Sequence, residues 1–448
     1  MTDTHDFLWG VATSAYQIEG GVGAAKGESI WDRFAHTAGK ISTGETGDFA
    51  CDHFHRWPED VALMADLGVT AYRFSIAWTR LFPEGSGRME PEGFDFYSGL
   101  IDALVEQGIE PIPTLYHWDL PQRLEDEGGW RNRATIDAFT EYATATVAAF
   151  GDRIKKWTTH NEPWVAAFAG HLEGVHAPGL TDWGAALTSG HHILVSHGRA
   201  ARAMRTEAPG IEIGIALDCR PSSPASGSDE DQAAQRHFDG FRNRWFFDPV
   251  FGHGYPADMM EAYRQRGRIV GDIPAWLHDG DLDEIAADID FLGLNYYTSI
   301  AVSDGSDETE YSGVPPGPHP PDGYTEMGWE ITPAALTGFL RRIHGEYQPR
   351  SIMVTENGAS YSEAPDASDS IADARRIAYL DQHIGALIDA RAHGVPVDGY
   401  FVWSLLDNFE WGLGFSQRFG LVWVDQHDGR RVPKDSFVWY RDRITTGI

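Results

Sequence analysis

The chain has 448 residues, of which 42% are hydrophobic and 23% are charged, a composition typical of a globular protein and not of a disordered one. Its 35 basic and 67 acidic residues give a net charge of -32, which repels nucleic acid and anionic membranes. We therefore expect neither nucleic acid nor a membrane as a partner.

The sequence favours a cytoplasmic location. No apolar run approaches the length of a bilayer-spanning helix, and residues 1–6 lack the basic segment and apolar core of a secretion signal. Cys51 and Cys219 are the only cysteines, and two distant cysteines make no disulfide framework. We expect both to be free thiols in a reducing compartment. The oligomeric state stays open.

Short apolar runs of β-like character alternate with helical patterns along the chain. We expect strands at residues 7–12, 71–75, 111–115, 156–159, 213–216, 291–294, 352–355 and 400–404. Helical spacing of apolar residues lies between most of them, at 58–67, 97–107, 136–150, 183–207, 333–347 and 374–393. Eight such alternations predict an α/β fold, a (β/α)8 TIM barrel that forms one domain over residues 1–448.

Several stretches are interpreted as loops. The glycine-rich residues 20–27 fit neither the dinucleotide fingerprint nor the phosphate-binding loop, so no cofactor is expected there. Residues 221–231, 303–325 and 360–370 are rich in Ser, Pro, Gly and acidic residues. Insertions in such barrels usually follow strands on the active face. The second stretch is compatible with a rim over a pocket and equally with a surface excursion.

Two glutamates each follow a predicted strand in an unusual neighbourhood. Glu162 lies between Asn161 and Pro163, and Glu356 lies between Thr355 and Asn357. A pair of carboxylates held at strand ends is what cleavage of a glycosidic bond requires. One gives a proton to the leaving oxygen, and the other meets the positive charge that develops on the sugar.

Other polar and aromatic residues fall at or just beyond the predicted strands, where barrel enzymes gather their active groups. They are Gln17, Arg73, His117, Trp118, Asn161, Asn295, Tyr297, Trp403, Glu410 and Trp411. Asp218 follows the fifth strand and is left unassigned. Amides and carboxylates bind hydroxyl groups, and flat rings pack against the apolar faces of sugars, so this mixture suits a neutral, hydroxyl-rich ligand.

Seven segments, in order over nearly the full length, resemble glycoside hydrolase family 1, the β-glucosidase and β-galactosidase family. They are FLWGVATSAYQIEG at 7–20, YRFSIAW at 72–78, HWDLP at 117–121, NEP at 161–163, NYY at 295–297, TENG at 355–358 and WSLLDNFEW at 403–411. His160 is a small departure, because family members more often carry an apolar or aromatic residue there.

The resemblance implies a role for each site residue. Glu356 is the expected nucleophile and Glu162 the expected acid/base, with Arg73 and Tyr297 supporting the Glu356 carboxylate. Asn161 is expected to hold the sugar 2-hydroxyl. The remaining sugar contacts are expected from Gln17, His117, Trp118, Asn295, Tyr297, Trp403, Glu410 and Trp411, and the leaving-group side from Trp164 and Trp329.

These roles predict a retaining mechanism. Its two carboxyl groups lie about 5–5.5 Å apart, since the second attacks the sugar directly. At that distance the charge of Glu356 raises the pKa of Glu162, which makes Glu162 a proton donor near neutral pH. Once Glu356 has become an ester, the pKa of Glu162 falls and Glu162 acts as a base.

The predicted activity is that of a retaining exo-β-glucosidase acting on terminal β-D-glucosyl residues of cello-oligosaccharides and of aryl or alkyl glucosides. A β-galactosidase, a β-fucosidase or a broad β-glycosidase with transglycosylation remains the alternative. A phospho-β-glycosidase is disfavoured by Glu410, which would repel phosphate. A thioglucosidase or a non-catalytic sugar-binding barrel is disfavoured because both glutamates are present.

A metal-dependent hydrolase is a further alternative. His53, His55, His191 and His192 invite such a reading, but no HExxH or similar spacing supports it. We expect neither a metal nor a cofactor.

Overall fold

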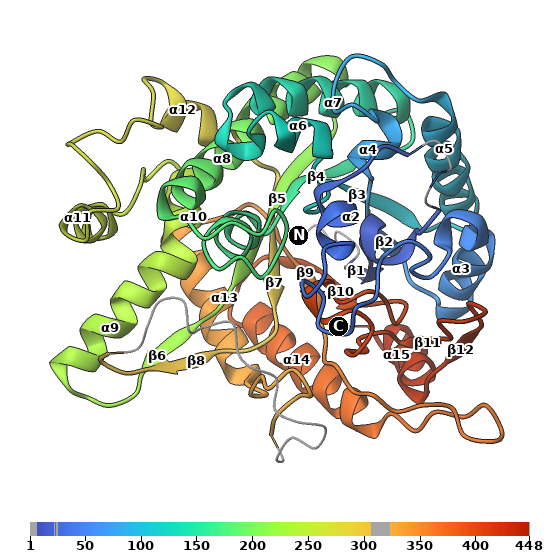
Figure 1. Cartoon of the computed structure of the whole chain (residues 1–448). Helices are drawn as coiled ribbons and strands as arrows, with labels where there is room; N and C mark the ends of the chain where they lie inside the picture. The colour runs from blue at the N-terminus through green and yellow to red at the C-terminus, as the bar shows by residue number, and fades with distance from the viewer. Residues whose placement is uncertain (1–6, 22, 24–25, 306–322, 448) are drawn as a thin grey trace.

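A computed structural model describes residues 7–21, 23, 26–305 and 323–447 of the chain. Its centre is a closed barrel of parallel strands (Figure 1), in the order β1-β10-β9-β7-β5-β4-β3-β2. The strands are β1 (Leu8–Ala12), β2 (Ala71–Ser75), β3 (Glu110–Tyr116), β4 (Lys156–Asn161), β5 (Glu212–Cys219), β7 (Phe291–Tyr296), β9 (Ile352–Asn357) and β10 (Val397–Trp403). The predicted barrel and all eight of its strands are confirmed.

Five strands, β3, β4, β5, β7 and β9, run past their predicted ends, and in three of them the extension matters for function. Asn161 still belongs to β4, Asn295 to β7 and Glu356 to β9. Across the sheet, Asn295 pairs with Glu356 on one side and with Asp218 on the other. The sheet therefore brings these polar side chains to one level at the carboxyl end of the barrel, where such folds hold their active sites.

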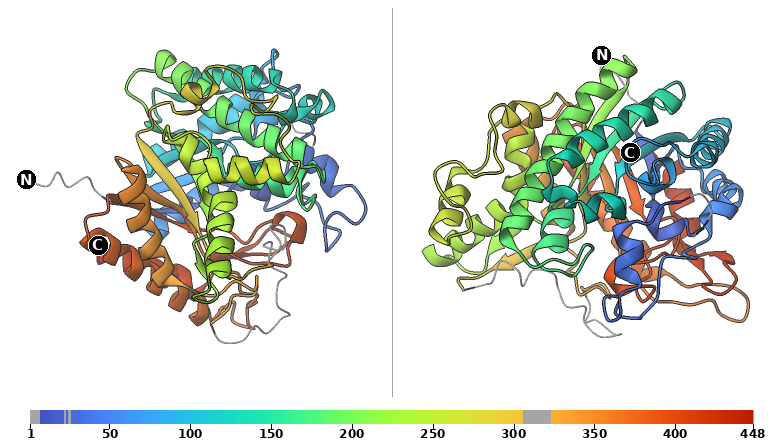
Figure 2. Two further views of the ribbon diagram at one scale, coloured as in Figure 1. Left: turned by 90° about the vertical axis from the view of Figure 1, so that its left-hand side faces the viewer. Right: turned by 45° about the horizontal axis from the view of Figure 1, so that its top comes forward.

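Helices cover the outside of the barrel (Figure 1 and Figure 2). The long ones are α3 (His53–Leu67), α5 (Pro91–Glu106), α7 (Ala134–Phe150), α8 (Trp183–Glu207), α13 (Pro333–Tyr347) and α14 (Ala374–Ala392). The predicted bounds of α8 and α13 match the structure, and the other four differ by up to six residues at an end. Strand–helix alternation is what positions the loops of the active face.

The remaining elements are short. They are α1 (Ala15–Ile18), α2 (Ile30–Ala35), α4 (Trp78–Leu81), α6 (Gln122–Asp126), α9 (Asp229–Asp239), α10 (Trp245–Val250), α11 (Ala257–Gln265), α12 (Asp281–Ile285), α15 (Asp435–Thr445), β6 (Ser222–Pro224), β8 (Ile300–Val302), β11 (Val422–Val424) and β12 (Arg431–Pro433). No helix within the described residues is long and apolar enough to cross a membrane.

The predicted loop at 221–231 is partly wrong. It holds β6, which pairs with β8, and the start of α9. Ser228 caps that helix by accepting a hydrogen bond from the Asp231 backbone, and acidic residues fill its first turn. A run of Ser and Asp is an N-terminal helix signal as much as a loop signal, which explains the error. Residues 360–370 contain neither helix nor strand, as predicted. Most of 303–325, and part of 20–27, lies outside the described residues.

Large aromatic side chains fill the space between barrel and helices. Trp31, Trp78, Trp130, Trp157 and Trp245 are fully buried. Trp78 donates its indole N–H to the Gly85 carbonyl at 3.0 Å and stacks on Tyr142 at 5.0 Å. It is a core residue.

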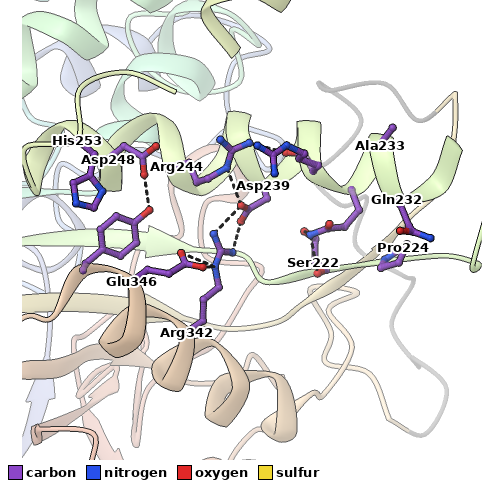
Figure 3. A pocket seen from close by; sticks show the side chains of 13 residues that line it. Ser222, Pro224, Gln232, Ala233, Asp239, Arg244, Asp248, His253, Arg342 and Glu346 are labelled. Atoms are coloured by element: carbon purple, nitrogen blue, oxygen red, sulfur yellow. Dashed lines mark hydrogen bonds and ion pairs between the residues drawn. The ribbon is translucent and has the colours of Figure 1, made fainter. Parts of the chain in front are cut away.

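A hollow of about 1050 Å³ lies on the outer face, between α9, α10 and α13 (Figure 3). Its charged side chains neutralise one another. Arg342 donates to both oxygens of Asp239, at 2.6 and 2.8 Å, and Tyr347 donates to Asp248 at 2.6 Å. We interpret these contacts as a structural link between helices, because the buried Asp239 carboxylate is already paired with Arg342.

Candidate active site

Glu162 and Glu356 line one cavity of about 690 Å³ at the carboxyl end of the barrel. Glu356 belongs to β9, and Glu162 is the first residue after β4. Both are buried, with 3% and 7% of their surfaces exposed. The two predicted catalytic carboxyls therefore face the same enclosed space.

Three residues of this site have left-handed backbone conformations that are uncommon outside glycine. Glu162 has φ 47°, Trp118 has φ 77° and Trp411 has φ 49°. Each such position costs on the order of 1 kcal/mol and persists only where the surroundings impose it. Three such backbone conformations around one cavity indicate that tertiary contacts hold the backbone of this site in place.

The Glu356 carboxylate is fixed at both oxygens. Arg73 Nη1 donates to Oε1 at 2.6 Å, and the Tyr297 hydroxyl donates to Oε2 at 2.6 Å. Arg73 is 1% exposed, so this ion pair is shielded from water. Charge-assisted hydrogen bonds of this kind are short and directional. They hold an ionised carboxylate in one orientation, which suits a nucleophile.

Asn161 and Asn295 join the two glutamates through hydrogen bonds. Asn295 Nδ2 donates to Glu162 Oε1 at 2.6 Å and to Asn161 Oδ1 at 2.9 Å. The same Asn161 oxygen accepts from Arg73 Nη2 at 2.6 Å, and Arg73 also binds Glu356. Both carboxyls thus belong to one buried network. A network in which every member has a partner is rigid.

The environment of Glu162 favours its protonated form. Burial, the charge of Asp218 and the charge of Glu356 all raise the pKa of this carboxyl well above its usual range, while the Asn295 hydrogen bond opposes them. A carboxyl that keeps its proton near neutral pH can donate it to a leaving group. Burial and Arg73 hold the pKa of His117 well below its usual value. Neutral His117 can accept a hydrogen bond from Asn161 Nδ2, 3.1 Å away.

Aromatic rings and one carboxyl form another wall of the cavity. His117 stacks between Trp403 and Trp411, at 5.9 Å from each ring, and Tyr16 supports Trp411 from behind at 6.0 Å. Glu410 Oε2 is buried and has no hydrogen-bond partner among the described residues. Burial, together with the charge of Glu356, raises the pKa of Glu410 to about 8. An unsatisfied buried carboxyl beside indole rings is suited to bind sugar hydroxyls.

The cavity brings together most of the residues predicted from the sequence. Its lining includes His117, Trp118, Glu162, Trp164, Asn295, Tyr297, Trp329, Glu356, Trp403, Glu410 and Trp411. Trp118 donates its indole N–H to the Asn161 carbonyl at 2.9 Å. Trp329 packs on Tyr297 with ring centres 5.2 Å apart. Arg73 and Asn161 act from behind the wall, through the network already described.

Gln17 lies outside that lining set. Its amide nitrogen donates to Asn408 Oδ1 at 3.0 Å and to the Phe409 carbonyl at 2.8 Å, and its oxygen accepts from the Ser14 hydroxyl at 2.6 Å. In this arrangement Gln17 ties the first βα turn to the segment that carries Glu410. Its expected contact with sugar stays a prediction.

Two of the histidines that suggested a metal each lie beside one carboxylate. His53 Nδ1 lies 2.7 Å from Asp60, and His191 lies 2.9 Å from both Tyr255 and Asp281. His160, the departure from the family pattern, contacts Ser196 at 2.9 Å and packs on Phe139 behind the barrel wall. His160 therefore lies on the core side of the strand that leads to Glu162.

Sequence reasoning missed a charged group in the cavity wall. Asp218, Arg242 and Glu173 line the cavity, and Asp218 Oδ2 lies 2.6 Å from Arg242 Nη2. Asp218 could have been assigned from its place after the fifth strand. Arg242 could not, because it lies in a π-helical turn (Gly240–Arg244) far from any strand end.

Comparisons with known proteins agree with this geometry. The model of "Glycosyl hydrolase family 1" matches residues 2–447. "Beta-glucosidase A" of Thermotoga maritima is 45% identical over 440 residues, 98% of this chain and 96% of that protein. "1,4-beta-D-glucan glucohydrolase" of Thermotoga neapolitana is 43% identical over 441 residues, 98% and 97% of the two chains. The solved family 1 β-glucosidase from Thermotoga maritima, 43% identical, superposes with a TM-score of 0.92 over 99% of this chain and 98% of that one.

Proposed function

The chain belongs to glycosyl hydrolase family 1 and is a retaining β-glycoside hydrolase, and we propose that Glu356 is its nucleophile and Glu162 its acid/base. The assignment rests on the different environments of the two carboxyl groups. Glu356 receives hydrogen bonds from a guanidinium and a phenol, which favour a fixed carboxylate. Glu162 is buried beside other acids, which raises its pKa and favours the proton donor.

The two half-reactions follow from that division. Glu356 attacks the anomeric carbon while Glu162 protonates the departing oxygen, which leaves a glycosyl ester on Glu356. The ester carries no charge, so one cause of the raised Glu162 pKa disappears. Glu162 then takes a proton from water, which attacks the same carbon and releases the sugar. Two inversions give net retention of configuration.

We propose terminal β-D-glucosyl residues of cello-oligosaccharides and of aryl or alkyl glucosides as the substrates. The names of the similar proteins, a β-glucosidase and a glucan glucohydrolase, support this class. The cavity supports it as well, because indole rings and the unpaired Glu410 oxygen suit one hydroxyl-rich ring. Galactosides and fucosides would share most of these contacts. A kcat/KM panel of aryl β-glycosides and cello-oligosaccharides ranks the three.

Azide rescue tests the assignment of roles. Glu356→Ala should lose turnover, and azide should restore it with an α-glycosyl azide as product, since azide then attacks directly. Glu162→Ala should retain slow turnover of activated aryl glucosides, and azide should give the β-glycosyl azide from the ester intermediate. The opposite pair of products would show that the two roles are exchanged.

A further inference from the structure

Asp218 lies beside the acid/base but has no part in the reaction as described above. It is the seventh residue of β5, the strand that pairs with β4, and the Glu162 backbone N–H donates to the β5 carbonyl of Ala216 at 2.8 Å. Asp218 is 7% exposed, and its side chain lines the same cavity as Glu162. A buried carboxyl therefore stands on the strand next to the proton donor.

Arg242 ties this carboxyl to the segment that carries Glu162. Its guanidinium forms an ion pair with Asp218 at 2.6 Å and stacks over the Trp164 ring at 3.5 Å. Trp164 is two residues beyond Glu162 and also lines the cavity. A guanidinium that stacks on an indole while it pairs with a carboxylate is held in one place. The two charges thus stay at fixed positions beside the acid/base.

We infer that the Asp218–Arg242 ion pair is a positioning device for Glu162, in which the carboxylate of Asp218 keeps the proton on Glu162 and Arg242 limits that effect. The inference rests on the proposed role of Glu162 as acid/base. In this proposal the ion pair acts in the first step of the reaction, in which Glu162 protonates the departing oxygen. How much this step needs a proton donor depends on the leaving group.

The electrostatic signs agree with this arrangement. Besides burial, the charges that raise the pKa of Glu162 are those of Asp218 and Glu356, and Arg242 lowers it. Burial raises the pKa of Asp218 itself, and Arg242 opposes that rise and so favours the carboxylate. The charge of Glu356 disappears when its ester forms, whereas Asp218 takes no part in that bond and keeps its ion pair with Arg242. Glu162 therefore remains a stronger base in the second step than it would be without Asp218.

Other charged and titratable groups face the same cavity from the surrounding elements. They are Lys40 before α3, His117 after β3, Glu173 and His176 in the segment between β4 and α8, Cys219 at the end of β5, Arg220 after it, Tyr297 after β7, Glu356 on β9 and Glu410 after β10, while Arg73 on β2 acts from behind the wall. Arg73 and Tyr297 bind Glu356, and Glu410 belongs to the sugar wall. Asp218 and Arg242 shift the pKa of Glu162 in opposite directions. An experiment can therefore distinguish the effect of Asp218 on Glu162 from the effect of Arg242.

The test is the pH dependence of kcat/KM for an alkyl β-glucoside, whose poor leaving group needs a proton. Asp218→Asn should move the alkaline limb to lower pH by on the order of one unit, because Arg242 is then unbalanced beside Glu162. In the Asp218→Asn variant, where residue 218 can no longer take up a proton, the additional change Arg242→Gln should move the same limb back to higher pH. The matched control is Asp239→Asn, which breaks a buried Asp–Arg pair of similar length outside the cavity (Figure 3) and should leave the limb in place. Limbs that do not move, or that move in the same direction with both changes, would overturn the inference.

A second substrate separates this inference from the proposed function. The dinitrophenolate of a dinitrophenyl β-glucoside departs without a proton, so Asp218→Asn should change kcat/KM for this substrate less than about 3-fold. On the alkaline limb, kcat/KM for the alkyl glucoside should fall by up to about 10-fold, as a shift of one pH unit implies. Equal losses on both substrates would mean that Asp218 only supports the fold. If Glu162→Ala also slows both substrates equally, the assignment of Glu162 fails instead.

Discussion

Arg73 and Glu356 are 283 positions apart in the sequence, yet Nη1 of the first lies 2.6 Å from Oε1 of the second. The other terminal nitrogen of Arg73 lies 2.6 Å from Asn161 Oδ1. One guanidinium therefore fixes both the proposed nucleophile and the residue that precedes the proposed acid/base. The contact with Glu356 needs the closed barrel, since β1 and β10 lie between β2 and β9.

Arg73→Lys should lower kcat by about 10²–10³-fold while KM changes little. A lysine ammonium is a single point charge and cannot reach the Glu356 and Asn161 oxygens together, so the carboxylate loses its fixed orientation. Steady-state kinetics on an aryl glucoside measure the effect, and circular dichroism checks the fold. A variant with nearly wild-type kcat would show that turnover does not need the simultaneous contact of Arg73 with Glu356 and Asn161.

Tyr297→Phe should lower kcat by about 10-fold or more, because Glu356 Oε2 loses its hydrogen bond from the phenol. The adjacent Tyr296 offers a matched control. Its hydroxyl donates to the Thr332 carbonyl at 2.6 Å, on the helix side of the strand. Tyr296→Phe should lower the melting temperature but leave kcat close to wild type. Equal kinetic losses in both variants would contradict a specific contact with Glu356.

Glu410→Gln should stabilise the folded protein near neutral pH and weaken sugar binding. The pKa of Glu410 is raised to about 8, above the 4.5 of an unfolded chain. The favourable contribution of the neutral form is complete below about pH 4.5 and is lost as pH rises through 8. Glutamine does not titrate, so its advantage in unfolding free energy should grow over that interval to on the order of 5 kcal/mol. Urea unfolding at pH 5 and pH 8 measures it, and an unchanged difference between the two pH values would refute the shift.

The same variant tests sugar recognition. Glu410 should contact sugar hydroxyls through the oxygen that lacks a protein partner. Glucosides and galactosides differ in one hydroxyl, so the loss of kcat/KM in Glu410→Gln should differ between them. Equal losses of kcat/KM on the aryl glucoside and the aryl galactoside would show that Glu410 does not contact the hydroxyl at which the two sugars differ.

The burial of Lys434 should make the unfolding free energy of the wild type rise at alkaline pH, and Lys434→Met should remove this rise. Lys434 is buried, 2.8 Å from Asp407 in the segment between Trp403 and Glu410, and burial lowers its pKa to about 8. Its contribution is complete above the unfolded pKa of 10.5 and is lost as pH falls through 8. The unfolding free energy of the wild type, relative to the variant, should therefore increase between pH 8 and 10.5. A difference that stays flat over that range would contradict the lowered pKa.

The chain should unfold as one cooperative unit, since we propose that residues 1–448 form a single domain. The barrel closes by pairing β1 with β10, so the two ends of the chain share one sheet. Differential scanning calorimetry should give one transition, with intrinsic fluorescence and far-UV circular dichroism midpoints that coincide. Two separated transitions would reveal independently stable parts.

The barrel strands were predictable because each is buried on both faces and therefore appears as a short apolar run. The ends of β4, β7 and β9 were not, because they carry Asn161, Asn295 and Glu356, which resemble loop residues. Neighbouring strands and buried hydrogen bonds keep these residues in the sheet. The start of α9 was missed for the opposite reason, since Ser228 and the acids after it also resemble a turn.

By itself, the sequence determined the number of barrel strands and the two carboxyls at strand ends, because both depend on residues that are adjacent in the chain. Only the tertiary structure decided that Arg242 would meet Asp218 and Trp164, and that Gln17 would bind Asn408 and Phe409. These contacts join segments up to hundreds of residues apart. They depend on barrel register and on how side chains pack once it has closed, which local sequence does not encode.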